Sequence, residues 1–456
     1  MAAFSPELAE IRFGCGLSPR IGATGSVADM LDRLAAPDHI AQRFPVPALG
    51  DLREEIAALA KLQRDRRKAQ GAAKEEATRQ LREASRKLRG EYETWMKHSI
   101  LRWVNTDQAL RERLALFWAD HFTAYGKAAL LRFAAPTYIE GALRPNLTGS
   151  FADLLFAAVT HPVMLHYLDQ ARSFGPNSRA AKRARRPRGL NENLAREVLE
   201  LHTLGVDGPY DQNDVRQLAE LFTGLSFGAE QGFLFRPALS EPGMHTVLGR
   251  RYGGDLTAVR QVLEDLATHP ATARHMATKL VVHFVSDKPD KALVDHLASV
   301  WTDTGGALLA VYAALLDHPA AWSPGRANVK PPFDFVASAL RAVDPPGLTQ
   351  LGSRDVRRSV LAPLVQMGQK WLRPPGPDGW PEADSAWVTP QGQAARIRWA
   401  MAASARLGRN APDPRRFAQV ALGSDVDPAV SFAASAAESR AEGVGIILVS
   451  PAFQRR

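Results

Sequence analysis

Apolar residues recur along most of the chain at the spacing of an amphipathic helix. Stripes with intervals of three and four residues run through 27–34, 110–118, 259–266 and 293–300. Alternating patterns typical of strands are nearly absent, apart from two short apolar patches around 233–249. The pattern therefore predicts an all-α fold with an irregular multi-helical body and at most a small β-hairpin. We expect a single large domain over residues 1–456.

Residues 51–98 differ from the rest of the chain. They are dense in both signs of charge, and their apolar positions are sparse. Gly71 is a plausible break between two helices, because glycine interrupts a helix at little steric cost. The segment predicts a charged helical hairpin that protrudes from the body as an insertion. Such an arm serves as solvated scaffolding or as a surface that docks a partner.

Two local patterns predict helix boundaries. His161, His269 and His318 each follow an apolar run and precede a proline, the residue that favours the first position of a helix. We interpret these His-Pro pairs as boundaries and not as a set of metal ligands. Asp211, with Asp214 three residues later, predicts an N-cap, because its spacing does not match a calcium loop.

The most informative segment is NENLAREVLELHTLG, residues 191–205. At helical spacing, one stripe carries Asn193, Arg196, Glu197 and Glu200. Two carboxylates three residues apart, next to a guanidinium, suit general acid and base chemistry or a metal site. The alternative is a surface stripe in which Arg196 forms salt bridges to glutamates four residues away on either side.

Two loops add candidate binding residues. Residues 179–188 hold six cations, among them Arg183 and Arg186, and form either an anion clamp or a solvated loop. A Pro/Gly-rich stretch carries Trp380 and Trp387, and indole faces beside carboxylates commonly hold sugar rings or cations. The alternative is a loop that its indoles anchor to the body.

Charge and missing motifs narrow the class of protein. The chain has 57 Lys and Arg against 48 Asp and Glu, a net charge of +9, which indicates an anionic partner. No P-loop and no H-E-x-x-H motif occurs, and no nucleic-acid-binding motif accompanies the basic loop, so a nucleic-acid partner is not expected. The sequence leaves both the cofactor and a metal requirement open.

The single cysteine and the termini carry further expectations. Cys15 cannot form an intramolecular disulfide and is best interpreted as a small buried hydrophobic residue. The amino terminus lacks the features of a signal peptide, and no window is apolar enough for a membrane span. We therefore expect a cytoplasmic protein without a membrane span.

Several segments together resemble a known family. They are residues 12–14, 117–122, 191–205, 207–215, 218–224, 268–274, 330–341, 379–381 and 450–455. Over nearly the whole chain they resemble the bacterial family catalogued as domain of unknown function 1800. The resemblance implies no settled activity. It implies that relatives are often exported and often encoded beside an uncharacterised, sulfatase-like family, which suggests the handling of an envelope or extracellular polymer.

These observations lead to two functional hypotheses. The first is a hydrolase or lyase that acts on an acidic polysaccharide or another anionic polymer. Its cleft would hold Glu197, Glu200 and His202 as catalytic residues. Its substrate-binding residues would be Asn193, Arg196, Arg183, Arg186, Lys330, Trp380 and Trp387. The second is a non-enzymatic accessory or assembly protein that binds such a polymer, or a protein encoded nearby, through the helical arm and the basic loop.

Overall fold

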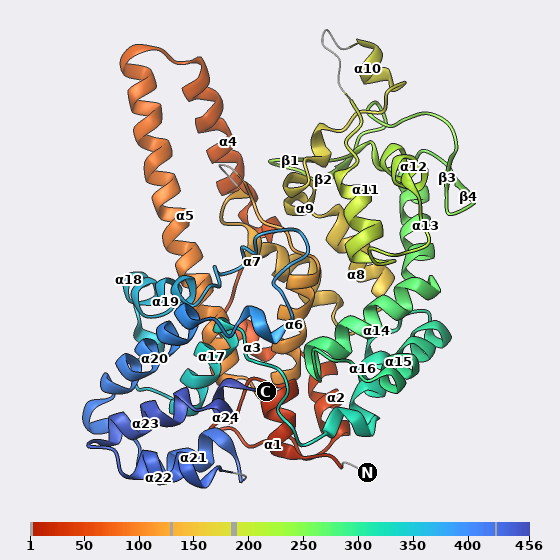
Figure 1. Cartoon of the computed structure of the whole chain (residues 1–456). Coiled ribbons are helices and arrows are strands. Elements are labelled where there is room, and N and C mark those ends of the chain that lie inside the picture. The colour runs from red at the N-terminus through yellow and green to blue at the C-terminus, as the bar shows by residue number, and fades with distance from the viewer. Residues whose placement is uncertain (1–2, 128–130, 184–188, 425) are drawn as a thin grey trace.

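The computed structural model describes residues 3–127, 131–183, 189–424 and 426–456. Within these residues the fold is built mainly from helices, which confirms the predicted all-α, irregular multi-helical body (Figure 1). Four short strands form two separate antiparallel hairpins: β1 (Leu225–Gly228) with β2 (Gly232–Phe235), and β3 (His245–Val247) with β4 (Arg250–Tyr252). The sequence predicted at most one hairpin. The structure has two because each of the two apolar patches pairs with its own neighbour.

The predicted charged hairpin is present and projects from the body (Figure 1). It consists of α4 (Arg53–Lys68) and the longer α5 (Gly71–Asn105). Gly71 has φ +55°, a left-handed conformation that suits glycine at this turn. In the outer part of the arm, Leu59 and Ala77 are the buried apolar residues, so the two helices share a thin contact. The last turns of α5 enter the body, where Trp103 is buried.

One large apolar core is formed by the first two thirds of the chain, with Trp118, Phe151 and Trp301 among its buried residues. The helices in this part of the chain before the small sheets, apart from those of the arm, are α1 (Pro6–Leu8), α2 (Val27–Ala35), α3 (His39–Arg43), α6 (Ala109–His121), α7 (Ala135–Tyr138), α8 (Phe151–Thr160), α9 (Pro162–Tyr167), α10 (Arg179–Arg183), α11 (Asn193–Glu197) and α12 (Gln212–Phe222). After the sheets come α13 (Leu256–Ala267), α14 (Pro270–Phe284), α15 (Lys291–Thr304) and α16 (Leu308–Asp317).

A second apolar core lies under the C-terminal helices and includes Trp103, Phe335 and Trp399. These helices are α17 (Pro332–Val343), α18 (Ser353–Val356), α19 (Ala362–Gln366), α20 (Pro390–Ala405), α21 (Pro414–Leu422), α22 (Pro428–Ser435), α23 (Arg440–Val449) and α24 (Pro451–Gln454). The base of α5 packs into this second core, whereas most of α6 packs into the first. The two helices therefore lie where the cores meet. The assignment of residues 1–456 to one domain stays a prediction.

The predicted helix boundaries are present in the structure. Each of His161, His269 and His318 is an N-cap whose Nδ1 accepts a backbone N–H two residues on, at 3.1–3.2 Å, and a proline begins each following helix. Asp211 caps α12, and the Asp214 side chain accepts the Asp211 N–H in return. The imidazoles of these pairs thus serve local capping.

Candidate functional site

A cavity of about 100 Å³ opens where the two cores meet. It lies between α6, α17 and the loop that precedes α20, residues 369–387, called the tryptophan-rich loop below. Its walls carry six aromatic side chains: Trp103, Tyr138, Phe333, Trp371, Trp380 and Trp387. The two predicted loop tryptophans thus line a common cavity, with ring centroids 5.8 Å apart. Trp387 is buried and its Nε1 donates to the Pro381 carbonyl, so this indole also anchors the loop. Both interpretations of the loop therefore have support.

Asp120, in the last turn of α6, holds the loop against the helix. Its carboxylate accepts the Trp380 N–H, at 2.9 Å to Oδ1 and 3.2 Å to Oδ2. Gly379 has φ +86°, and a Cβ there would lie 2.6 Å from the Asp120 Oδ2, so only glycine fits this approach. Burial raises the pKa of Asp120 to about 7, and the nearby Glu382 carboxylate adds to the rise. Asp120 can therefore donate or accept a proton near neutral pH.

Beside Asp120, the loop residue Glu382 orients a buried imidazole. His283 of α14 has its Nδ1 2.8 Å from the Glu382 Oε1. Burial lowers the pKa of His283, so the ring is neutral at pH 7 and donates Nδ1–H to the carboxylate. In this tautomer Nε2 carries a lone pair, and this buried atom has no hydrogen-bond partner among the described residues. The pair therefore presents an oriented base.

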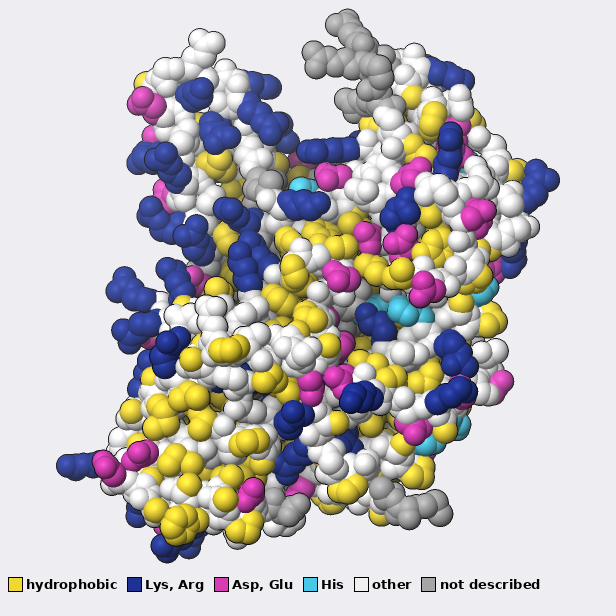
Figure 2. Space-filling view, in the orientation of Figure 1, with side chains coloured by type: hydrophobic (Ala, Val, Ile, Leu, Met, Phe, Trp, Pro, Cys, Tyr) yellow, Lys and Arg dark blue, Asp and Glu magenta, His cyan; other side chains and the backbone are white. Residues whose placement is uncertain are grey.

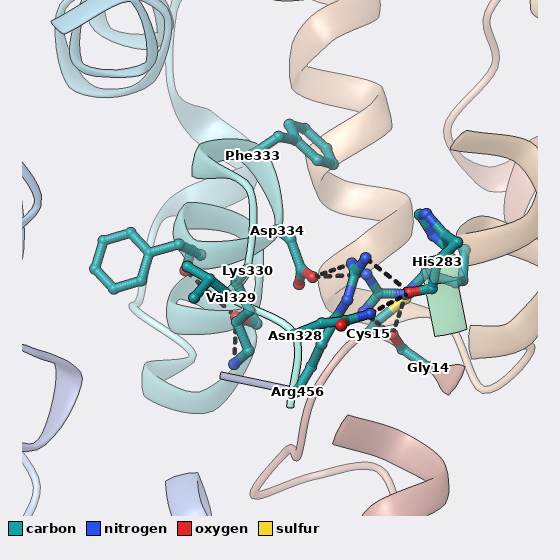
Figure 3. Close-up of polar contacts among 12 residues, drawn as sticks. Gly14, Cys15, His283, Asn328, Val329, Lys330, Phe333, Asp334 and Arg456 are labelled. Atoms are coloured by element: carbon teal, nitrogen blue, oxygen red, sulfur yellow. Dashed lines mark hydrogen bonds and ion pairs between the residues drawn. The ribbon is translucent and has the colours of Figure 1, made fainter. Parts of the chain in front are cut away.

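A buried ion cluster forms the floor of the cavity. Asp334 of α17 binds two guanidiniums through Oδ2, that of Arg113 at 2.6 Å and that of Arg456 at 2.8 Å (Figure 3). Arg456 also donates to the His283 carbonyl at 3.1 Å. Burial alone would raise the pKa of Asp334, but Arg113, Arg456 and Lys330 hold it well below its usual range. Asp334 thus stays ionised and links three distant parts of the chain.

Several polar atoms of the lining residues are buried without a protein partner. Five residues that line the cavity carry such atoms, which have no partner among the described residues: Tyr138 Oη, His283 Nε2, Asp334 Oδ1, Trp371 Nε1 and Arg456 Nε. Buried polar groups nearly always have hydrogen-bond partners, because an unsatisfied one costs about 1–3 kcal/mol. Two of these atoms accept, two donate and the tyrosine hydroxyl does both. A small molecule with several hydroxyl groups would match this set.

The predicted acid and base residues of α11 do not line this cavity. Arg196 pairs with Glu200 at 3.2 Å and with Glu192 at 3.4 Å, which are the surface salt bridges of the alternative interpretation. Glu197 is half-buried and forms no such pair with any of the described residues. Burial, followed by the Glu200 and Asp378 carboxylates, raises the pKa of Glu197 to about 7. Because Asp378 belongs to the tryptophan-rich loop, Glu197 lies within electrostatic range of that loop.

His202 and Asn193 lie on opposite sides of the same segment. The helix continues from α11 as a π-helical turn over Val198–His202, which rotates His202 into the core. His202 is 1% exposed and packs on Phe122, with ring centroids 5.1 Å apart. Burial lowers the pKa of His202 to about 3, so this imidazole is neutral. Asn193 is exposed at the start of α11.

The remaining predicted binding residues are dispersed. Lys330 is buried, with Nζ 3.2 Å from the Ser338 Oγ and 4.0 Å from the centroid of the Phe453 ring. Burial lowers the pKa of Lys330 to about 7, and the side chain does not line the cavity. Arg183 is exposed at the end of α10. Arg186 falls outside the described residues.

Metal and thiol chemistry find little support in the described part of the chain. No three His, Cys, Asp or Glu residues there are grouped so as to hold a metal ion. Cys15 is buried and burial raises its pKa well above the usual value, in agreement with its interpretation as a small hydrophobic residue. No helix among the described residues combines the length and apolar character needed to cross a membrane.

Comparison with known proteins assigns the chain to a family. The family model described as "Protein of unknown function (DUF1800)" matches residues 11–455, so the chain belongs to this family. The resemblance stated from the sequence is thereby confirmed. No curated protein and no solved structure gives a significant match.

Sequence reasoning did not select most residues of this site. In the sequence, Asp120 stands out only as the neighbour of His121. In the structure the two side chains point apart, because His121 points into the core, with its Nε2 3.3 Å from the His202 carbonyl oxygen. Glu382 stood in the tryptophan-rich loop without an assigned role. His283 and Asp334 lie inside apolar helical stripes, where a single polar residue carries no local signal.

Proposed function

We propose that this protein is a hydrolase or lyase that acts on an acidic polysaccharide, with its active site in the aromatic cavity around Asp120. The observation that carries the proposal is the combination of aromatic walls with five buried polar atoms that lack partners among the described residues. Sugar rings stack on aromatic faces, and their hydroxyl groups both donate and accept. The cavity volume of about 100 Å³ is smaller than that of typical ligand pockets, which measure roughly 300–1,000 Å³. The cavity would therefore hold about one ring of a polymer.

The proton chemistry falls to two neighbouring groups. Protonated Asp120 would give its proton to the glycosidic oxygen of the leaving chain. His283, oriented by Glu382, would remove a proton through Nε2. In a hydrolase that proton comes from the attacking water, and in a lyase from the carbon beside the substrate carboxylate. Each general acid or base step contributes roughly 10²–10⁴-fold to the rate.

The residues of α11 enter this proposal as a second candidate group. With its pKa raised to about 7, Glu197 also changes protonation near neutral pH. Glu200, Arg196 and Asn193 lie next to it and would contact the polymer outside the cavity. The activities of variants of Asp120 and of Glu197 therefore show which of the two residues acts as the general acid.

The test is a depolymerisation screen with the purified protein. Substrates are polygalacturonate, alginate, hyaluronate and chondroitin sulfate, each with and without a chelator. Reducing ends report hydrolysis, and an ultraviolet-absorbing unsaturated product reports elimination. We expect activity on at least one substrate, a loss of roughly 10²-fold or more in Asp120→Asn, and a smaller loss in Glu197→Gln. Full activity in Asp120→Asn would overturn this assignment of the active site.

The second candidate function is a non-enzymatic accessory protein that binds an anionic polymer or a protein encoded nearby. The exposed charges of the projecting arm favour it. It requires binding without turnover in the same screen. The cytoplasmic location expected from the sequence stays a prediction, which fractionation of cells expressing the untagged protein would test.

A further inference from the structure

The outer part of the arm carries a large local excess of positive charge. Residues 61–89 carry eleven Lys and Arg against four Asp and Glu, an excess of seven out of the net +9 of the whole chain. Ten of these eleven cations are exposed, and Arg66 is half-buried. Figure 2 shows Lys and Arg side chains along the arm, which stands beside a hollow that separates it from the part of the body with α8–α13.

These cations are largely unneutralised. Arg79 pairs with Glu76 at 2.7 Å and Lys87 with Glu91 at 3.7 Å. Among the described residues, the other nine cations of this segment form no ion pair. Like charges crowded on one helix repel each other, so this arrangement opposes folding of the arm unless a counter-charge binds.

The spacing of the cations on α5 forms a row. Arg79, Arg82, Arg86 and Arg89 follow each other at intervals of three and four residues, which places them on one face of the helix. Successive guanidiniums along such a face are about 5 Å apart in the direction of the helix axis. A linear polymer with one anionic group on each of several consecutive rings matches such a row, and arginine pairs well with carboxylate and sulfate oxygens.

The composition of the arm also selects the class of polymer. Residues 61–89 contain no aromatic residue, so the arm has no surface on which unpaired nucleic-acid bases would stack. The large hydrophobic side chains that are exposed in the described structure are Val206, Met244, Val365, Val388, Ile397 and Phe432, all outside the arm. A protein partner would therefore find none of the apolar anchors that dominate protein interfaces. A charged polysaccharide needs neither feature.

The arm is continuous with the cavity. Arg89 and Trp103 belong to the same helix, and Trp103 lines the cavity about 20 Å further along the axis. Between them, the Tyr92 hydroxyl donates to the Trp371 carbonyl at 3.3 Å, which ties the base of the arm to the tryptophan-rich loop. A polymer of several rings that lies along the arm would thus reach the cavity with its end.

We propose that the outer arm is a binding site for an acidic polysaccharide chain and that its arginine row on α5 holds the polymer for the cavity. For the role of the cavity this inference rests on the proposed function, whereas binding by the arm can be measured without any turnover.

The experiment measures the affinity of the full chain for polygalacturonate over a series of salt concentrations. The arm variant replaces Arg79, Arg82, Arg86 and Arg89 by Gln, which keeps the helix propensity nearly unchanged. The matched control replaces four exposed arginines of the C-terminal helices, Arg398, Arg415, Arg416 and Arg440, by Gln, so that the net charge changes equally. Circular dichroism checks that both variants keep their helices.

We expect the arm variant to bind roughly tenfold or more weakly at low salt, with a shallower dependence of affinity on salt. The control should stay within about twofold of the wild type. Equal losses in both variants would show that only net charge matters and would overturn the proposal. So would unchanged binding in the arm variant, or tighter binding of a DNA duplex of equal total charge.

The outcomes for the arm and the cavity are separable. Asp317→Asn, at an exposed aspartate outside the arm and the cavity, should bind polygalacturonate like the wild type. If no substrate is turned over but the arm variant alone loses binding, the proposed enzymatic function fails and the arm site stands. If activity is found and the arm variant keeps full affinity, the arm inference fails alone.

Discussion

The charged side chains of the arm lie in solvent, whereas those of the cavity are buried, and the two regions use charge differently. On the arm, most cations of residues 61–89 face water without a partner. At the cavity, Asp334 is 3% exposed and forms ion pairs with two arginines. His283 forms a hydrogen bond with Glu382. An exposed charge keeps its ordinary protonation and acts over distance. A buried charge must be paired, and burial shifts the pKa values that catalysis uses.

The largest expected effect concerns the buried side of this comparison. Asp334→Ala leaves the guanidiniums of Arg113 and Arg456 buried without their anion, so the free energy of unfolding should fall by about 3–5 kcal/mol. Denaturant titration measures the change. Asp317→Ala, at an exposed aspartate, is the control and should shift stability by no more than about 0.5 kcal/mol. A small effect at Asp334 would mean that the cluster is not held as tightly as the geometry indicates.

The second prediction concerns the pH dependence of stability. The pKa of Asp120 is raised by burial to about 7 in the folded state, against about 3.9 for an unfolded aspartate. Between pH 4 and 7 the unfolded chain has released this proton while the folded chain retains it, so rising pH lowers stability by up to about 4 kcal/mol. Asp120→Asn should remove this loss and be more stable than the wild type above pH 7. Denaturant titrations from pH 4 to 8 measure it.

Asp317→Asn is the control for this titration and should retain the wild-type pH dependence. A variant of the arm should retain it as well, since arginines do not titrate in this range. If Asp120→Asn followed the wild-type curve, the buried carboxyl would not titrate as proposed.

The third prediction tests how closely the loop approaches α6. Gly379→Ala would force a Cβ to within 2.6 Å of the Asp120 Oδ2 and place alanine at φ +86°, so stability should fall by about 2–3 kcal/mol. Gly368→Ala shares the positive φ, +99°, but its Cβ would meet open space, and it should cost about 1 kcal/mol. The difference between the two melting curves isolates the contact with Asp120. Equal losses of stability in the two variants would mean that the loop moves away from Asp120 to make room for the Cβ.

The smallest effect on stability is expected at the arm. Replacing Arg79, Arg82, Arg86 and Arg89 by Gln should shift the melting temperature by no more than about 2 °C, because these side chains are exposed. The same variant should lose polymer binding. A large drop in melting temperature would mean that the arginines support the arm instead of serving a ligand, and would remove the contrast with the cavity.

Several features of the fold were predictable because their signals are local. The helical stripes, the break at Gly71 and the N-caps at His161, His269 and His318 follow from residue spacing within about ten positions. The tryptophan-rich loop was selected on composition alone, and both its tryptophans line the cavity. For Arg196, the surface salt bridges described as the alternative are present in the structure.

The site itself was not predictable in the same way. Arg113, Asp334 and Arg456 meet in one ion cluster although they are far apart in the sequence. His202 was predicted to share a cleft with Glu197 and Glu200, but it ends the π-helical turn Val198–His202 and is buried in the core. Such outcomes depend on how helices pack, and residue spacing within one helix contains no information about its neighbours.

The sequence by itself determined that this chain forms a helical body with a charged arm, that residues 61–89 of this arm carry an excess of seven positive charges, and that the chain belongs to its family. These properties depend on composition and on contacts between residues close in sequence. Only the tertiary structure decided which polar groups share the cavity and how their protons are held. The physical reason is that a pKa near 7 for Asp120 arises from burial between α6 and a loop some 260 residues away in the chain, and that burial exists only when both cores are assembled.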